Sequence, residues 1–264
     1  MRFEKLLWSV VALGTLTSVA VAEPLRTIYT KENRFPGAMG VELSLNGVYT
    51  GIDNDEPMED GSRYEIGPAV RFGVTDRIAL SLYVPVAGYD FGDDIDESGI
   101  GDIHAGGQFL FFEDIFEYAW IVPYVDVRFA SGDEDKGLGS GETGAQFGIS
   151  VGTTIMDCLQ FAADASYEIN SIYAARDDDA LVGALSIVWD LNEMPRVYGG
   201  VTSSLFAEIQ VRDDSPDIDD DYWTRGHGGL SFRANDLFTI SGFAGASSST
   251  AMDYYAGGRM IFSF

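Results

Sequence analysis

The sequence contains almost no cysteine: Cys158 is the only one among 264 residues. One thiol cannot form a disulfide within the chain, so a scaffold held together by disulfides is excluded. Histidine is nearly as rare, with only His104 and His227, and the sequence has no H-x-H, H-E-x-x-H or cysteine-cluster pattern. Those are the patterns that hold zinc and related metals. We therefore expect no metal site and no cofactor.

Basic residues are also few. The chain has 16 Lys and Arg against 42 Asp and Glu, a formal net charge of −26 at pH 7. A nucleic-acid-binding surface needs clustered basic residues, so that class of function is excluded. Two interpretations of the acidic loops stay open: they attract cations or bridge to lipopolysaccharide through divalent ions, or they are simply solvated. The loops hold 23 acidic and three basic residues, at positions 53–60, 90–97, 133–142, 176–179 and 212–221.

Long apolar runs are missing after the N-terminal stretch. Residues 1–22 combine Arg2 and Lys5 with an apolar run and the small residues Ala20-Val21-Ala22. This is the pattern of a cleaved secretory signal peptide, so we expect the mature chain to begin at Glu23. No later segment approaches the roughly eighteen consecutive apolar residues of a transmembrane helix. If the chain crosses a membrane, it must do so with β-strands.

Glycine and aromatic residues, by contrast, are plentiful. The 31 glycines, 13% aromatic residues and only 8 prolines suit many strands joined by tight turns. From Ala38 onward, apolar and polar residues alternate, and acidic or glycine-rich breaks separate the alternating runs, as in a meander of hairpins. Twelve such runs can be counted, at residues 38–50, 63–74, 78–86, 101–112, 118–130, 143–153, 159–171, 180–190, 196–211, 222–234, 237–247 and 253–264.

These runs predict an all-β chain that folds as a 12-stranded antiparallel up-and-down transmembrane β-barrel. The expected divisions are a signal peptide at 1–22, an N-terminal periplasmic segment at 23–37 and the barrel at 38–264. With an even number of strands, both ends of the barrel lie on the periplasmic side. The short connections then fall on that side and the acidic ones outside. We expect a monomer in the cell outer membrane of a Gram-negative bacterium, with the lipid bilayer as its surroundings.

The last run shows the two faces most clearly. Tyr254, Met260 and Phe262 alternate with Tyr255 and Arg259, which gives one apolar face and one polar face. Pairing of this strand with the first strand would close the barrel and remove both sheet edges. The aromatic C-terminus also resembles the strand that the outer-membrane assembly machinery recognises. The alternative is the final strand of a soluble β-sandwich.

The polar faces of the strands define the candidate site. Twelve strands enclose more room than about eight, which side chains fill, and less than about sixteen, which leave a water-filled channel. Two readings of a lumen with charges of both signs stay open: a narrow polar passage, or a plug of salt bridges. The residues expected to line the pore are Glu42, Glu65, Arg71, Tyr83, His104, Tyr124, Asp126, Arg128, Asp164, Glu168, Glu208, Trp223, Arg225, His227, Arg233 and Arg259.

A twelve-stranded outer-membrane barrel could also be a phospholipase, which hydrolyses lipids. That chemistry needs a serine and a histidine within hydrogen-bonding reach, at a place that lipid can enter. His104 and His227 share their strand faces with charged residues, so both should point into the lumen. His227 and Ser231 lie four residues apart, about 13 Å along a strand, which is too far to bond. We therefore expect no catalytic residues and no enzyme activity.

Two stretches carry a resemblance to a known family. Ser98 to Ile103 reads SGIGDI, and Arg128 to Gly144 reads RFASGDEDKGLGSGETG. Together with SLYVPV at Ser81 to Val86, they resemble the outer-membrane proteins of the meta-pathway phenol-degradation family. The chain departs from that pattern at Ala130-Ser131, where proline and threonine are usual, and in its acidic loops. The motifs are rich in glycine and indicate tight loop geometry, so no binding residue is carried over.

The resemblance implies a transporter for aromatic or other hydrophobic small molecules. The function expected from the sequence is accordingly an outer-membrane channel for passive uptake of small, aromatic or hydrophobic, cargo. The alternative is a barrel that does not conduct and acts as a structural or surface-interaction protein through its acidic loops.

Overall fold

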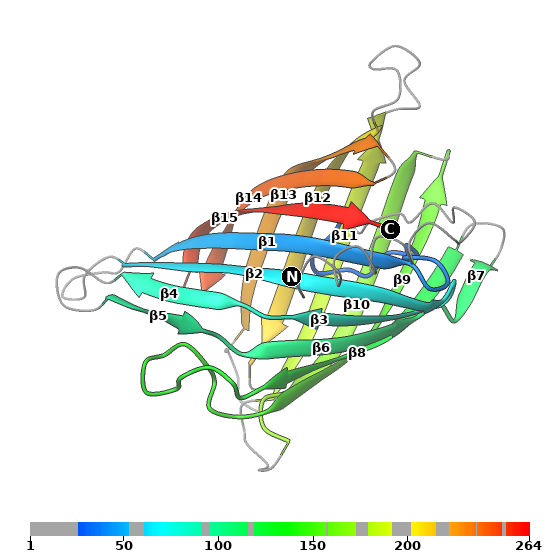
Figure 1. Ribbon diagram of the computed structural model, residues 1–264. Helices are drawn as coiled ribbons and strands as arrows, with labels where there is room; N and C mark the ends of the chain where they lie inside the picture. Colours follow the sequence, from blue (N-terminus) through cyan, green and yellow to red (C-terminus); the bar gives the residue numbers. More distant parts are fainter. Residues whose placement is uncertain are drawn as a thin grey trace, which may run out of the picture.

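A computed structural model describes residues 26–52, 61–90, 96–115, 119–156, 158–172, 179–191, 202–214, 222–235, 237–249 and 252–264. The regular elements over these ranges are β-strands, and none of the described residues forms a helix long and apolar enough to cross a membrane. The strands form one antiparallel sheet that closes on itself (Figure 1). The predicted closed 12-stranded barrel is confirmed.

Closure depends on the first and last strands. β1 (Val41–Ile52) pairs with β15 (Met252–Ser263) on one side and with β2 (Gly61–Thr75) on the other. The remaining elements are β3 (Ile78–Tyr83), β4 (Val86–Asp90), β5 (Asp96–Ile100), β6 (Ile103–Phe109), β7 (Phe112–Ile115), β8 (Ala119–Phe129), β9 (Gly144–Ile155), β10 (Leu159–Ile169), β11 (Ala180–Asp190), β12 (Thr202–Asp213), β13 (Tyr222–Asn235) and β14 (Phe238–Ser249).

The third and fourth strands of the barrel are longer than the sequence indicated, and each is divided into shorter segments. β3 and β4 together make the third strand of the barrel. They are separated at Pro85, which has no N–H to donate to a neighbouring strand. The fourth strand of the barrel consists of the segments β5, β6 and β7. Residues 90 and 96–97, expected in a loop, belong to the paired strands β4 and β5. The loop boundary predicted from polar composition was therefore wrong. Acidic residues at the end of a hairpin can still form hydrogen bonds through their backbones.

The two faces of the wall follow the alternation of the sequence. Large apolar side chains such as Leu80 and Leu185 point outward and are exposed, whereas polar groups such as Ser150 and Gln160 are buried on the inner face. Exposed apolar side chains over the whole outer wall are the pattern of a surface that faces lipid.

The chain before β1 departs from the expectation most clearly. We expected residues 23–37 to form a separate segment on the periplasmic side. Residues 23–25 lie outside the described residues, but residues 26–37, named here the inner segment, lie inside the barrel (Figure 1). Its partners come from strands all round the wall, β2, β9, β11, β12 and β15 among them. A segment with this many polar partners in the lumen is part of the barrel interior.

A small apolar core anchors one end of the inner segment. Phe35 packs with the fully buried side chains of Trp120 and Val122 and with Leu110 of the wall. The Trp120 ring lies against Gly152 on the next strand, where an added Cβ would sit 2.1 Å from the indole carbon Cζ2. The glycine therefore makes the room that the largest buried side chain occupies.

Candidate functional site

The inner segment is held in the lumen mainly by the carboxylate of Glu208 on β12. Glu208 accepts hydrogen bonds from the backbone N–H groups of Ile28 (2.5 Å), Tyr29 (3.1 Å) and Thr30 (3.0 Å). On its other side it lies 3.2 Å from Nε2 of His227, whose side chain is also fully buried. Three consecutive donors on one anion fix the path of the segment, since each would otherwise be unpaired in the interior.

A second anchor lies within the segment itself. The buried carboxylate of Glu32 accepts hydrogen bonds from the N–H and the guanidinium of Arg26 and lies 3.1 Å from Nε of Arg34. Arg26 reaches on to Asp190 and to Gln160 of the wall. Burial alone would raise the pKa of Glu32, but the charges of Arg26 and Arg34 bring it down to about 2. The segment thus carries its own ion cluster, which is tied to β10 and β11.

The low pKa of Glu32 gives the anchor a predictable dependence on pH. The carboxyl group ionises near pH 4.5 when unfolded and near pH 2 in place, so its contribution is complete above pH 4.5 and is lost as the pH falls through 2. Hydrogen exchange of peptide 26–37, corrected for the intrinsic rate, should show strong protection at pH 5 that falls between pH 4.5 and 2. In Glu32→Gln the fall over this range should be much smaller. A wild-type profile that does not change down to pH 2 would contradict the assignment.

The lumenal cavity beside the inner segment has a volume of about 580 Å³. Ten of the sixteen residues expected to line a pore border it. They are Glu42, Glu65, Arg71, Tyr83, His104, Tyr124, Asp126, Glu168, Arg225 and Arg259. Tyr29, Lys31 and Phe243, which were not predicted, border it as well.

The carboxylates of this cavity have partners close by. Glu42 pairs with Arg71 at 2.6 Å, Asp126 with His104 at 2.9 Å, and Glu168 with Arg212 at 2.5 Å. Glu65 accepts a hydrogen bond from the Tyr83 hydroxyl at 2.9 Å. The lumen therefore contains the salt-bridged pairs that one of the two sequence interpretations allowed, and it contains open space beside them.

The other six predicted residues lie elsewhere on the inner side. Arg128 lines a separate outer pocket, and Trp223 donates from its indole to Asp214 at 2.6 Å. Asp164 accepts from the hydroxyls of Tyr124 and Ser150, while Glu208 and His227 hold the inner segment. Arg233 is a partly buried residue of β13 that borders neither cavity. These residues support the interior more than they line a passage.

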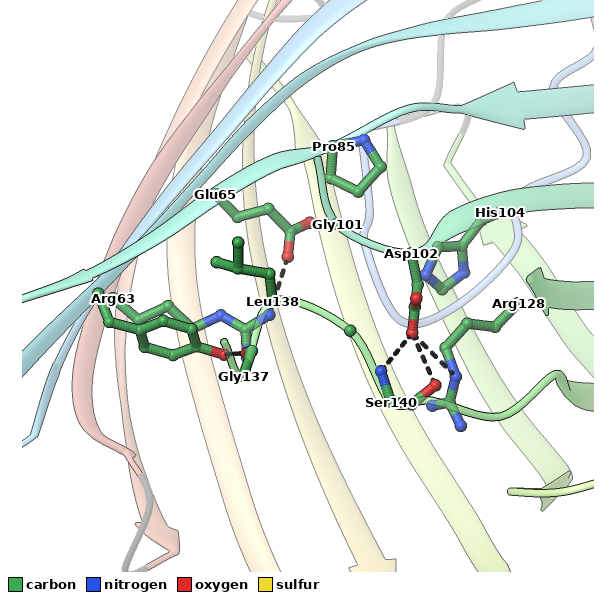
Figure 2. A pocket seen from close by; sticks show the side chains of 12 residues that line it. Arg63, Glu65, Pro85, Gly101, Asp102, His104, Arg128, Gly137, Leu138 and Ser140 are labelled. Atoms are coloured by element: carbon green, nitrogen blue, oxygen red, sulfur yellow. Dashed lines mark hydrogen bonds and ion pairs between the residues drawn. The ribbon is translucent and has the colours of Figure 1, made fainter. Parts of the chain in front are cut away.

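The outer pocket explains the glycine-rich motifs of the sequence. It has a volume of about 330 Å³ and is bordered by Gly137 to Ser140 of the loop and by wall residues such as Arg63 and His104 (Figure 2). The carboxylate of Asp102 accepts from the backbone N–H groups of Ser131 (3.1 Å), Gly132 (2.9 Å) and Ser140 (2.7 Å), and from the Ser140 hydroxyl (2.6 Å). Gly132 and Gly139 pass so closely that an added Cβ would lie 2.7 Å from the facing Cα. The motif residues thus hold the loop of residues 131–142 against the barrel wall.

Removing the Asp102 carboxylate should release this loop. In Asp102→Ala the three N–H groups lose their acceptor, at a cost of about 1–3 kcal/mol for each that remains buried. Lys136, exposed in the same loop, is the natural reporter. Trypsin should cut after it at least tenfold faster in Asp102→Ala than in the wild type. Asp133→Ala, a change of the same charge at an exposed position of the loop, should leave the rate unchanged; equal rates in all three proteins would show that Asp102 does not hold the loop.

Comparison with solved structures shows what this architecture is similar to. The COG4313 outer membrane channel from Pseudomonas putida F1 matches with a TM-score of 0.63 and 12% identity, over 92% of this chain and all of that one. The NanC porin matches with a TM-score of 0.53 and 12% identity, over 84% of this chain and 98% of the porin. No family model and no curated protein matches the sequence. At these identities the likeness shows the fold alone, a closed antiparallel β-barrel like those of the outer-membrane proteins compared.

The expectation that the chain is not an enzyme was wrong as an inference from its fold. LpxR from Salmonella typhimurium, an outer-membrane enzyme barrel, matches with a TM-score of 0.51 and 13% identity over 84% of this chain. The barrel fold by itself therefore does not separate enzymes from channels.

Sequence reasoning missed the functional residues of the inner segment because the segment has no hydrophobic period. A signal was nevertheless present. Arg26, Lys31 and Arg34 place three of the chain's 16 basic residues within nine positions, in a protein that is otherwise strongly acidic. A short cationic stretch next to a barrel with acidic inner residues could have been matched to the lumen by charge.

Proposed function

We propose that the protein is an outer-membrane channel for the passive uptake of small molecules through the barrel lumen. The observation that carries this proposal is the cavity of about 580 Å³ next to the inner segment, lined by both charged and aromatic side chains. A barrel built only to present loops would have no need for open lumenal space. The likeness to outer-membrane channels and porins supports the same reading.

Aromatic or hydrophobic cargo is the finer part of the proposal. It is supported by the motif resemblance to the meta-pathway phenol-degradation family and by the rings of Tyr29, Tyr83, Tyr124 and Phe243 around the cavity. Such rings offer faces for stacking and edges for contact with a planar ligand. Arg71, Arg225 and Arg259 add donors that would orient polar groups on the same molecule.

Conductance in planar bilayers tests the channel directly. A steady conductance is expected, and it should change in size or ion selectivity in Arg71→Met, because Arg71 borders the cavity and also donates to the carbonyl of Arg34 in the inner segment. The matched control is Arg77→Met, which changes an exposed arginine in the turn between β2 and β3. A protein that never conducts would support the alternative, a structural or surface-interaction barrel that acts through its acidic loops.

We further propose a monomer that is exported with cleavage before Glu23, assembled through its C-terminal strand and bordered by lipopolysaccharide. The outward Phe262 and Phe264 support the role of the last strand. Most of the acidic segments that would meet lipopolysaccharide lie outside the described residues. The mass of the mature protein from outer membranes, together with its size in detergent, would test cleavage and oligomeric state.

A further inference from the structure

Lys31 differs from the other basic residues of the inner segment. Arg26 and Arg34 both pair with Glu32, whereas no carboxylate of the described residues lies within 4.0 Å of the Lys31 ammonium. Its backbone N–H donates to the hydroxyl of Ser150 at 2.8 Å. Its Nζ lies over the ring of Tyr124, 4.9 Å from the centroid, and the side chain borders the central cavity. The ammonium therefore faces the cavity, with the ring of Tyr124 beside it.

The three carboxylates whose charges act on Lys31 already have hydrogen-bond or ion-pair partners. Asp126 pairs with His104, Asp164 accepts from two hydroxyls, and Glu208 holds the backbone of the inner segment. Desolvation by burial lowers the pKa of Lys31, and these carboxylates oppose that effect only from a distance. An ammonium that is partly withdrawn from water in this position is stabilised when an anion comes to it.

Two further cationic groups face the same cavity. Arg225 lies over the ring of Tyr29, 4.4 Å from the centroid, and donates from Nε to Gln210 at 2.6 Å. Arg259 borders the cavity and is close enough for its charge to act on Lys31. The cavity thus offers positive groups beside aromatic rings, while its own carboxylates are paired.

We propose that the central cavity is a binding site for a small aromatic carboxylate, whose anionic group meets Lys31 and whose ring lies among the tyrosines of the wall. The inference rests on the proposed uptake function for its physiological meaning, and it narrows the cargo from small aromatic molecules to those that carry a carboxylate. A carboxylate would form with Lys31 the charge-assisted contact that no residue described in the structure supplies. The ring would pack against Tyr29, Tyr83 and Phe243, which border the same space.

Equilibrium binding to the purified full barrel in a neutral detergent tests this site. Benzoate and benzamide are the probes, because they share a ring and nearly the same shape but only benzoate is charged. Benzoate should bind more tightly than benzamide to the wild type. In Lys31→Met, which keeps an unbranched side chain, benzoate binding should weaken by about 10–100-fold while benzamide binding stays the same.

The control is Lys136→Met. After residue 22 the chain has only these two lysines, and Lys136 lies in an exposed loop, 3.3 Å from Glu97. Its replacement should leave benzoate binding unchanged. Equal binding of the two probes to the wild type, or equal benzoate binding by the wild type and Lys31→Met, would overturn the proposal.

A second measurement avoids the risk that Lys31→Met disturbs the inner segment. Reductive methylation with a ¹³C label marks Lys31, Lys136 and the N-terminal amine and keeps their charge. Benzoate should shift the Lys31 resonance and raise its apparent pKa, and should leave Lys136 unchanged; no shift at Lys31 would overturn the site. Binding is measured without transport, so a barrel that binds benzoate but never conducts would refute the channel alone. One that conducts but does not bind benzoate would refute the carboxylate site alone.

Discussion

Replacing Glu208 with alanine is expected to increase the single-channel conductance of the barrel several-fold. The carboxylate is the shared acceptor of the N–H groups of residues 28, 29 and 30, and each of these costs about 1–3 kcal/mol if it stays buried without a partner. The variant also removes the neighbour of the buried His227. Release of the inner segment from β12 is the cheapest way to return these groups to water, and it widens the passage. Recordings in planar bilayers would measure the change.

The control for this prediction is Glu65→Ala. Glu65 is another inward carboxylate, and its partners among the described residues are Tyr83 and Arg63 of the wall, not the inner segment. Both variants remove one negative charge from the lumen, so a change in surface potential would affect them alike. A similar conductance in Glu208→Ala and Glu65→Ala would mean that the inner segment does not limit the passage.

Replacing Trp120 with alanine is expected to lower the free energy of unfolding by about 3–5 kcal/mol, the range for a large aromatic side chain lost from a packed interior. Trp120 is 1% exposed, and its indole fills the space left by Gly152 and supports Phe35 of the inner segment. The small side chains around it, Ala79 and Ala162, cannot move far enough to fill the void. Urea unfolding of the refolded barrel, followed by circular dichroism, would give the difference.

Trp189→Ala provides the comparison, because Trp189 lies on the outer face of β11 and is 39% exposed. Its loss removes contact with lipid or detergent and leaves no cavity in the protein, so the decrease in unfolding free energy should be clearly smaller. Equal decreases for the two tryptophans would show that the interior around Trp120 is not tightly packed.

The wall of the barrel could be predicted from the sequence because a strand repeats every two residues. Leu43 and Leu45 point outward and Glu42 points inward for the same reason that they alternate in the chain. Closure followed from the two faces of the last strand, which pairs with β1 as expected. Alternation also placed Tyr83 and Asp126 on the cavity side.

The contents of the lumen could not be predicted in the same way. The inner segment binds through backbone N–H groups, as Tyr29 and Thr30 do to Glu208, and these groups are the same in every residue type. Asp102 lies two residues before the inward His104, but its four hydrogen bonds go to a loop about 30 residues later, and no local pattern reports such a partner. Long-range polar contacts were therefore the part that required the structure.

The position of the inner segment also sets an order of assembly. The groups that receive it, on β2, β9, β11, β12 and β15, come together only when the sheet has curled and its two edges have met. The earliest described part of the chain can therefore complete its contacts only when Tyr255 of β15, more than 200 residues further along, is in place.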